Sequence, residues 1–149
     1  MKARKATVNQ RGGRIIVDRV DTTVDGIPVV TDDIAVLDAD VGTRELGEAV
    51  LGAVGRARGG IPRVQREEGE IRLQALLRAA GVRSWRSFMR GCRDVSVFAV
   101  EGGVELMPSV NLGAREGFVG LPDESITVAA DDPVMVGEAV YRALDAAQT

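Results

Sequence analysis

The sequence predicts an α+β fold, a single domain in which a mainly antiparallel sheet is flanked by helices and which contains two related strand-helix units. Two short glycine turns each separate a pair of apolar, β-branched runs, a pattern typical of antiparallel hairpins. Two other segments carry apolar residues at helical spacing. The 149 residues match the length of one ordinary domain, so we expect one domain over 1–149 with a flexible N-terminus at 1–5.

The first part of the chain predicts a hairpin, one or two further strands and a helix. Segments 6–10 and 14–20 flank a turn at Gly12-Gly13, and another turn is indicated by Asp25-Gly26. Segment 27–37 is rich in Val and Ile, which favours strands. The helix that follows is predicted to end near Gly55, and its apolar face consists of Leu46, Ala49, Val50, Ala53 and Val54.

The middle of the chain predicts a connector and two helices. Segment 56–66 contains Gly59, Gly60 and Pro62, so we expect an exposed connector. A helix over 71–80 is closed by Gly81. Ser84 then begins a short helix as its N-cap, and we expect this helix to place three residues in the core rather than around a ligand: Trp85, Phe88 and Met89.

The last part of the chain repeats the order of hairpin, strand and helix. Strands are predicted at 94–100 and 104–107, with Pro108 ending the second strand or marking a sheet edge. Segment 111–123 is rich in glycine and predicts a mobile loop. A strand at 126–129 precedes the Asp132-Pro133 helix start, and the helix face consists of Val136, Ala139, Val140, Ala143 and Leu144.

The tetrapeptide Gly-Glu-Ala-Val occurs twice, at 47–50 and 137–140, in both helices of the two related units. A strand with Ile-x-Val and an acidic turn precede each copy. Glycine inside a helix costs about 1 kcal/mol relative to alanine, so we expect Gly47 and Gly137 to permit close approach of each helix to the sheet. Glu48 and Glu138 could form a carboxylate pair, but the sequence favours exposed helix residues.

The composition argues against most enzyme classes. The chain contains no histidine, which removes the commonest metal ligand and the usual general base near neutral pH. Its one cysteine, Cys92, lacks a neighbouring lysine or histidine, and the only lysines are Lys2 and Lys5. We therefore expect no enzymatic activity, no cofactor and no metal, although a site built from carboxylates alone stays open.

The charged residues occur in blocks of opposite sign, although the net charge of the chain is only −3. The net charges are +5 for 1–20, −7 for 21–54, +7 for 55–93 and −8 for 94–149. All ten basic residues of the third block are arginines, which bind phosphate and carboxylate groups in bidentate fashion. This block predicts either a nucleic-acid-binding module built on the arginine-rich segment 56–93 or arginines that pair with the acidic blocks.

Three motifs together resemble a known bacterial family: the paired Gly-Glu-Ala-Val helices, the stretch GVRSWRSFM at 81–89, and the Asp-Asp-Pro helix start. The chain resembles immunity proteins of contact-dependent growth inhibition systems over most of residues 30–147. The resemblance implies a small cytoplasmic protein that binds the toxic C-terminal domain of a delivered effector, frequently a nuclease, and blocks it. Gly47, Trp85, Phe88 and Gly137 match the family as scaffold residues.

The sequence adds two expectations to this resemblance. No apolar stretch has the roughly 20 residues of a membrane span and no secretory signal follows Met1, which also favours the cytoplasm. Acidic residues around the first strand-helix unit are candidates for the toxin-binding face, although a solvated turn explains them as well: Asp32, Asp33, Asp38 and Asp40. The oligomeric state is not indicated.

Overall fold

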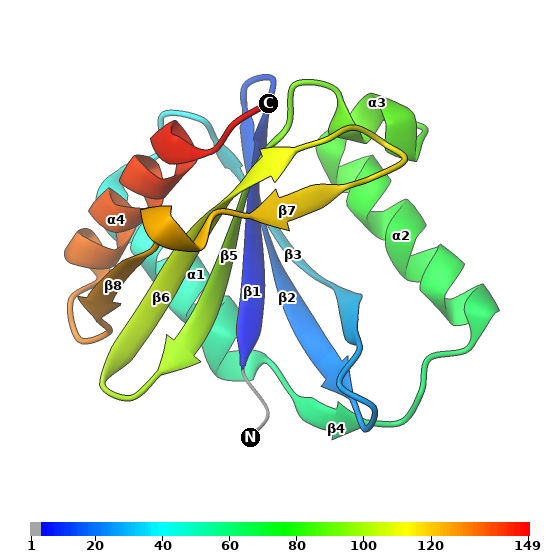
Figure 1. Cartoon of the computed structure of the whole chain (residues 1–149), viewed down its shortest axis with the longest axis horizontal. Helices are drawn as coiled ribbons and strands as arrows, with labels where there is room; N and C mark the ends of the chain where they lie inside the picture. The colour runs from blue at the N-terminus through cyan, green and yellow to red at the C-terminus, as the bar shows by residue number, and fades with distance from the viewer. Residues whose placement is uncertain (1–3) are drawn as a thin grey trace.

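An eight-stranded sheet organises the chain in the computed structural model, which describes residues 4–149 (Figure 1). The strands are β1 (Lys5–Arg11), β2 (Arg14–Thr23), β3 (Pro28–Asp38), β4 (Gly59–Ile61), β5 (Arg93–Val100), β6 (Gly103–Asn111), β7 (Phe118–Gly120) and β8 (Ile126–Ala129). The helices are α1 (Thr43–Arg56), α2 (Arg66–Ala80), α3 (Trp85–Met89) and α4 (Pro133–Ala146), with a 3-10 turn at Pro122–Glu124. Both hairpins, the four helices and the mainly antiparallel sheet confirm the predicted α+β class.

The sheet consists of two similar halves. Its order is β3-β2-β1-β5-β6-β7, with β8 also pairing with β6 and β4 with β2. Each half contains a hairpin, a third strand beside it and a helix, namely β1-β2-β3-α1 and β5-β6-β8-α4, and the halves meet where β1 pairs antiparallel with β5. The two related strand-helix units are therefore confirmed, and the repeated topology also includes the hairpins.

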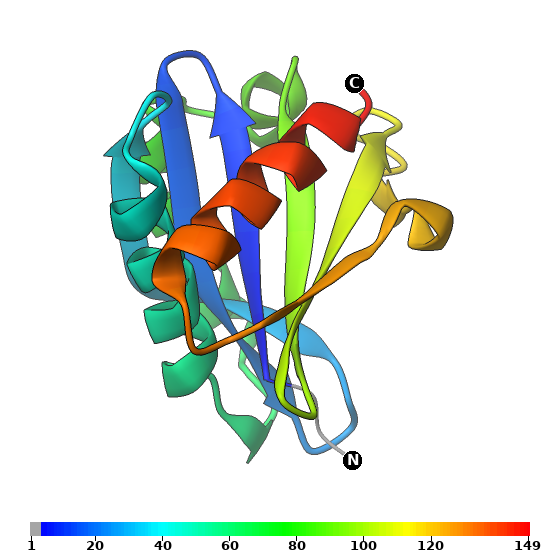
Figure 2. The ribbon, with the colours of Figure 1, turned by 90° about the vertical axis from the view of Figure 1, so that its left-hand side faces the viewer.

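Helices α1 and α4 lie side by side over one face of the sheet (Figure 2). Alternate residues of the central strands point toward them, because successive side chains of a strand face opposite sides. The buried side chains of this first core include Val8 and Val95, which pair across β1 and β5, and Leu46 and Val140 from the helices. Burying these apolar stripes holds the two helices on the sheet.

The two repeated glycines make a reciprocal contact between α1 and α4. A Cβ atom on Gly47 would lie 1.8 Å from the carbonyl oxygen of Pro133, and one on Gly137 would lie 1.9 Å from that of Thr43. The prediction that these glycines permit close packing is correct, but the predicted neighbour is wrong: each glycine approaches the first turn of the other helix and not the sheet.

Helices α2 and α3 cover part of the opposite face and enclose a second core. Its buried residues include Ile16, Leu77 and Phe88, and Trp85 stacks on Phe88 with ring centroids 5.2 Å apart. Helix α2 ends at Gly81, whose φ of +73° is the left-handed conformation that glycine adopts easily. Ser84 Oγ accepts from the Ser87 amide at 3.1 Å, so the predicted N-cap of α3 is confirmed.

Two segments that the sequence indicated as irregular contribute strands. In segment 56–66, β4 pairs parallel with the end of β2, beyond Val20, where the pairing of β2 with β1 ends. Most of the segment is exposed, but Ile61 is buried, so the prediction of an exposed connector is wrong at this residue. Segment 111–123 contains β7, which pairs with β6, and the start of the 3-10 turn, and its mobility stays a prediction.

Of the two alternatives predicted for Pro108, the end of the strand is wrong, whereas a position at a local sheet edge is correct. Pro108 lies inside β6, and its carbonyl accepts from the Leu121 amide at 2.8 Å on the outer side of the strand. The backbone nitrogen of Pro108 faces the same outer side of β6. On that side, the pairing of β6 with β8 ends at Leu106 and its pairing with β7 begins at Ser109, so Pro108 lies in the gap between them. Proline is tolerated because no neighbouring strand requires an N–H group there.

The predicted flexible N-terminus is only partly within the described chain. Residues 1–3 lie outside it, and Lys5 pairs with Val20 and Phe98 as the first residue of β1.

Candidate functional site

The four acidic residues predicted to bind a partner come from edge strand β3 and the turn after it, but they face different directions. Asp33 lies on the side of the sheet covered by α1, because it alternates with Thr31 and Ala35 along β3. Asp32 and Asp38 are exposed and belong to the alternate set that faces the α2 side. Asp40 is exposed in the turn between β3 and α1.

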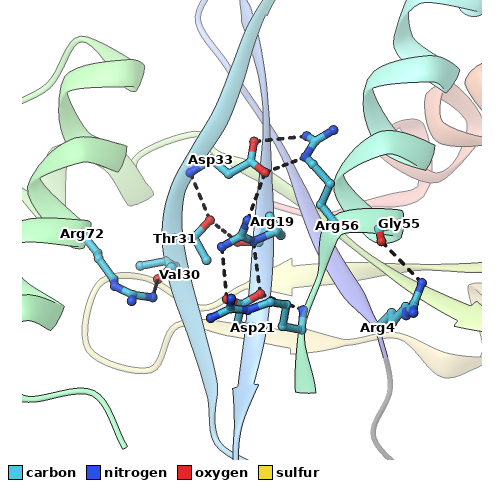
Figure 3. Close-up of polar contacts among 10 residues, drawn as sticks. Arg4, Arg19, Asp21, Val30, Thr31, Asp33, Gly55, Arg56 and Arg72 are labelled. Atoms are coloured by element: carbon cyan, nitrogen blue, oxygen red, sulfur yellow. Dashed lines mark hydrogen bonds and ion pairs between the residues drawn. The ribbon is translucent and has the colours of Figure 1, made fainter. Parts of the chain in front are cut away.

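Asp33 is part of an ion-pair network between β2, β3 and the end of α1 (Figure 3). Arg56 holds its carboxylate in bidentate fashion, with Nε 2.7 Å from Oδ2 and Nη2 3.1 Å from Oδ1. Arg19 Nη1 lies 3.4 Å from the same Oδ2. Hydrogen bonding from Arg56 is the main cause that lowers the pKa of Asp33 below its usual range. The carboxylate is therefore already paired with two cations of its own chain.

A register shift in β2 places Arg19 in this network. The shift lies between Asp18 and Val20, and the hydroxyl of Thr31 donates to the Arg19 carbonyl at 2.9 Å. The Arg19 guanidinium then reaches Asp21, with Nε 3.1 Å from Oδ1. Asp21 also accepts from the Arg58 amide at 2.9 Å, and this bond fixes the connector between α1 and β4 against the sheet.

The arginine-rich segment divides into paired and exposed members. Arg56 and Arg63 form ion pairs with Asp33 and Asp25 of the preceding acidic block, whereas Arg66 and Arg72 pair within α2. Arg93 Nη1 donates to three carbonyls at the end of α4, the shortest at 2.9 Å to Leu144. Five arginines of segment 56–93 form no side-chain hydrogen bond or ion pair with the described residues: Arg58, Arg78, Arg83, Arg86 and Arg90. Intramolecular pairing thus explains half of the segment.

Two buried aspartates on the sheet face opposite α1 and α4 were not singled out from the sequence. Asp18 is 1% exposed, and Asp94 is 5% exposed. Burial raises the pKa of Asp18 to about 7 and also raises the pKa of Asp94. The sequence feature that could have indicated them is an aspartate inside each of two apolar strands. Periodicity alone does not show that both side chains lie among polar neighbours on the same face of the sheet.

The polar layer around these aspartates consists of neutral donors from adjacent strands. Asp94 accepts from Asn9 Nδ2 at 2.8 Å and from Ser109 Oγ at 2.8 Å. Asp18 Oδ1 accepts from the Thr7 hydroxyl, and its Oδ2 has no partner among the described residues. A buried carboxylate without a cation is costly to ionise, which is why burial is the main cause of both shifts.

The remaining candidate groups are two exposed carboxylates on different helices and one buried thiol. Glu48 and Glu138 are exposed on separate helices. Burial raises the pKa of the Cys92 thiol to about 12, which opposes formation of a thiolate. Across residues 4–149, no group of three or more carboxylate or thiol side chains could hold a metal ion. None of the helices formed by these residues is long and apolar enough to cross a membrane.

The same arrangement of sheet and helices occurs in two solved structures. One is a protein of unknown function, NMB0488, from Neisseria meningitidis, with a TM-score of 0.83, 16% identity, and coverage of 98% of this chain and 96% of that chain. The other is a chain of the CdiA-CT/CdiI toxin and immunity complex from Yersinia pseudotuberculosis, with a TM-score of 0.83, 15% identity, and coverage of 99% of both chains.

This chain shares their fold. No protein-family model matches the sequence, and no curated protein matches it either. Since the identities are 15–16%, the likeness concerns the fold alone. It nevertheless agrees with the sequence resemblance to immunity proteins, because one of the two similar structures is a toxin and immunity complex.

Proposed function

We propose that this protein is an immunity protein that binds and neutralises the toxic C-terminal domain of a contact-dependent growth inhibition effector in the bacterial cytoplasm. The observation that carries the proposal is the whole-chain similarity to a chain of the CdiA-CT/CdiI complex, which covers 99% of both chains. The sequence motifs of the two repeated helices and of segment 81–89 support the same family.

We propose that this protein acts by covering the toxin and does not turn over a substrate. An inhibitor of this kind needs a complementary surface, and the two acidic blocks have net charges of −7 and −8. A nuclease binds the phosphate backbone with a cationic surface, so acidic side chains can occupy the place of the phosphates. Such complementarity mainly accelerates association and selects the partner. We therefore propose a nuclease domain as the toxin.

The exposed acidic residues of β3 and its following turn remain the proposed contact with the toxin. Asp32, Asp38 and Asp40 have exposed side chains, whereas Asp33 acts indirectly by holding Arg56. On this proposal, the first three residues contribute directly to the rate of association. Asp33 contributes by holding Arg56 at the end of α1.

Co-expression with the toxin domain encoded beside this protein tests the function directly. We expect the two polypeptides to co-purify and the nuclease activity of the toxin to fall when this chain is added in equimolar amount. If this chain neither binds that neighbouring polypeptide nor protects nucleic acid from it, the proposed function is wrong.

A charge-reversal variant tests the proposed surface. Replacement of Asp32, Asp38 and Asp40 by Lys should slow association with the toxin at least about tenfold at low salt. The control reverses three other exposed acidic residues with the same change in net charge: Asp123, Glu124 and Asp131. Equal association rates for the two variants would show that Asp32, Asp38 and Asp40 are not part of the interface.

A nucleic-acid-binding module is the second candidate, and the exposed arginines near α3 favour it. Arg78, Arg83, Arg86 and Arg90 are exposed and have no described ion-pair partner. This candidate predicts RNA or DNA binding that weakens steeply with salt. An electrophoretic shift assay at low salt decides it, because a module of this type must retard nucleic acid under those conditions.

A further inference from the structure

The first half of helix α2, residues 66–75, contains no buried residue. The buried residues of this helix are Leu76, Leu77 and Ala80, which all belong to its second half. An open cavity of about 530 Å³ lies along the first half, and Ile71 in its lining is 67% exposed. Core packing therefore holds the second half of α2 and gives the first half little support.

Interactions within the first half are also weak. It contains Gly69, which lowers helix propensity. Its ion pairs join residues four positions apart, and the one between Arg66 and Glu70 has side chains that are 92% and 65% exposed. Solvent screens such a pair. Short helical segments are marginal in water without tertiary packing, so this half depends on a contact with the rest of the molecule.

That contact is a hydrogen bond from Arg72 to the edge of the sheet (Figure 3). Strand β3 lies at one end of the strand order, and Nη1 of Arg72 donates to its Val30 carbonyl at 3.1 Å. Within residues 4–149, no other hydrogen bond joins segment 66–75 to the sheet. Arg72 is therefore placed as a latch between the first half of α2 and β3.

We propose that the first half of α2 is a releasable cover on the edge of β3, latched by Arg72, and that its release admits the toxin to this edge. The toxin as partner rests on the proposed function. Release frees the Val30 carbonyl, which lies two residues before Asp32, one of the proposed toxin contacts. Because the toxin binds the released state, its association rate follows the released fraction.

Two substitutions in the cover should change its release in opposite directions. Gly69→Ala improves helix propensity, and the added methyl group has space because the nearest atom, a Val64 methyl carbon, would lie 4.0 Å away. This variant should hold the cover in place. Arg72→Met keeps an aliphatic stem but removes the donor to Val30, so it should favour release.

Amide hydrogen exchange of the full chain, followed by NMR, measures the release. In the wild-type protein, the amides of residues 70–74 should exchange at least about tenfold faster than those of residues 76–80. Exchange at 70–74 should become about fivefold slower in Gly69→Ala and at least about threefold faster in Arg72→Met. Equal exchange in the two halves of the wild-type helix, or rates that neither substitution changes, would show that the cover does not open.

The rate of association with the toxin tests whether the cover controls access to β3. We expect Arg72→Met to raise this rate at least about threefold and Gly69→Ala to lower it about fivefold. The control is Arg78→Met, which removes the same charge from an exposed arginine in the second half of α2. It should change the rate by less than about twofold, since it does not touch the latch.

These measurements separate failure of this inference from failure of the proposed function. If the toxin binds but its association rate is the same in Arg72→Met, Gly69→Ala and the wild-type protein, the cover does not control access and the inference is wrong. If no toxin binds the chain, the proposed function fails and the toxin as partner fails with it. The exchange rates alone then decide whether the cover opens.

Discussion

Gly47 of α1 lies directly against Pro133, the first residue of α4, at a separation that leaves no space for a methyl group. Gly137 of α4 has the same relationship to Thr43, the first residue of α1. In both cases the opposing atom is a backbone carbonyl oxygen, which cannot move away as a flexible side chain could. The repeated glycines therefore determine how closely the two halves of the molecule pack.

Replacement of Gly137 by Ala should consequently destabilise the protein. We expect the free energy of unfolding to fall by about 3 kcal/mol, since overpacking against backbone commonly costs 1–3 kcal/mol or more. Urea unfolding followed by circular dichroism measures it. Gly55→Ala is the control, because a Cβ at Gly55 of α1 meets nothing within 4 Å and alanine has the better helix propensity. If both variants were equally stable, the helix contact would not be tight.

The buried Asp18 should make stability depend on pH. Its pKa is raised to about 7 in the folded chain from a value near 3.8, so between these values the folded state holds a proton that the unfolded state has lost. Stability therefore falls as pH rises from about 4 to about 7, and the loss is complete above that range. Asp94, whose pKa is also raised by burial, contributes in the same direction.

Two variants that alter the hydrogen bond between Thr7 and Asp18 should change the pH dependence of stability in opposite directions. Asp18→Asn should flatten it and raise the free energy of unfolding at pH 8 by on the order of 2 kcal/mol, because the charged form no longer has to be buried. Thr7→Val removes the donor to Asp18 and should steepen the profile. Urea unfolding at pH 5 and pH 8 measures both slopes. Parallel profiles for the wild-type protein and Asp18→Asn would show that Asp18 does not bind a proton in this range.

Arg93 should stabilise the end of α4. Its guanidinium donates to the carbonyls of Leu144, Asp145 and Ala147, at a helix C-terminus where a cation is favourable. Arg93→Met should lower the free energy of unfolding by about 1–3 kcal/mol, since these carbonyls lose a charged donor. Arg90→Met, at an exposed arginine, should change it by less than about 0.5 kcal/mol. If Arg93→Met and Arg90→Met had equal effects in urea unfolding, the Arg93 side chain would not stabilise the end of α4.

Asp33 and Arg56 should be energetically coupled, but weakly. The pair is bidentate, yet Arg56 is 55% exposed, so solvent and salt screen it. A double-mutant cycle with Asp33→Asn and Arg56→Met should give a coupling energy of about 1 kcal/mol at low salt that decreases at 0.5 M salt. Because the pKa of Asp33 is lowered, this contribution should disappear as the pH falls through the folded-state pKa. A coupling of zero at low salt would show that the ion pair does not form in solution.

Local signals in the sequence determined the elements and their ends. The helix spacing, the Asp132-Pro133 start, the Ser84 cap and the Gly81 end were all predicted, because each depends on residues within one or two turns of the chain. The same reasoning failed for β4, since three residues with two glycines form a strand only when the end of β2 is available to pair with them.

The candidate site was predicted less completely than the fold. The sequence indicated the acidic residues near β3, but it could not show that Asp33 is paired with Arg56 and Arg19, from other elements. It also gave no reason to connect Asp18 with Asp94, which belong to different strands on the same sheet face. Both groupings depend on strand register, which local spacing does not specify.

The sequence alone determined that this is one α+β domain with two related strand-helix units, because apolar periodicity and turn residues depend only on positions that are close together in the chain. Only the tertiary structure decided that Gly47 and Gly137 hold the helices against each other, and that Asp18 and Asp94 are buried in one polar layer. The physical reason is that these contacts join residues far apart in the chain. Their burial and pKa values are set by neighbours that only folding brings together.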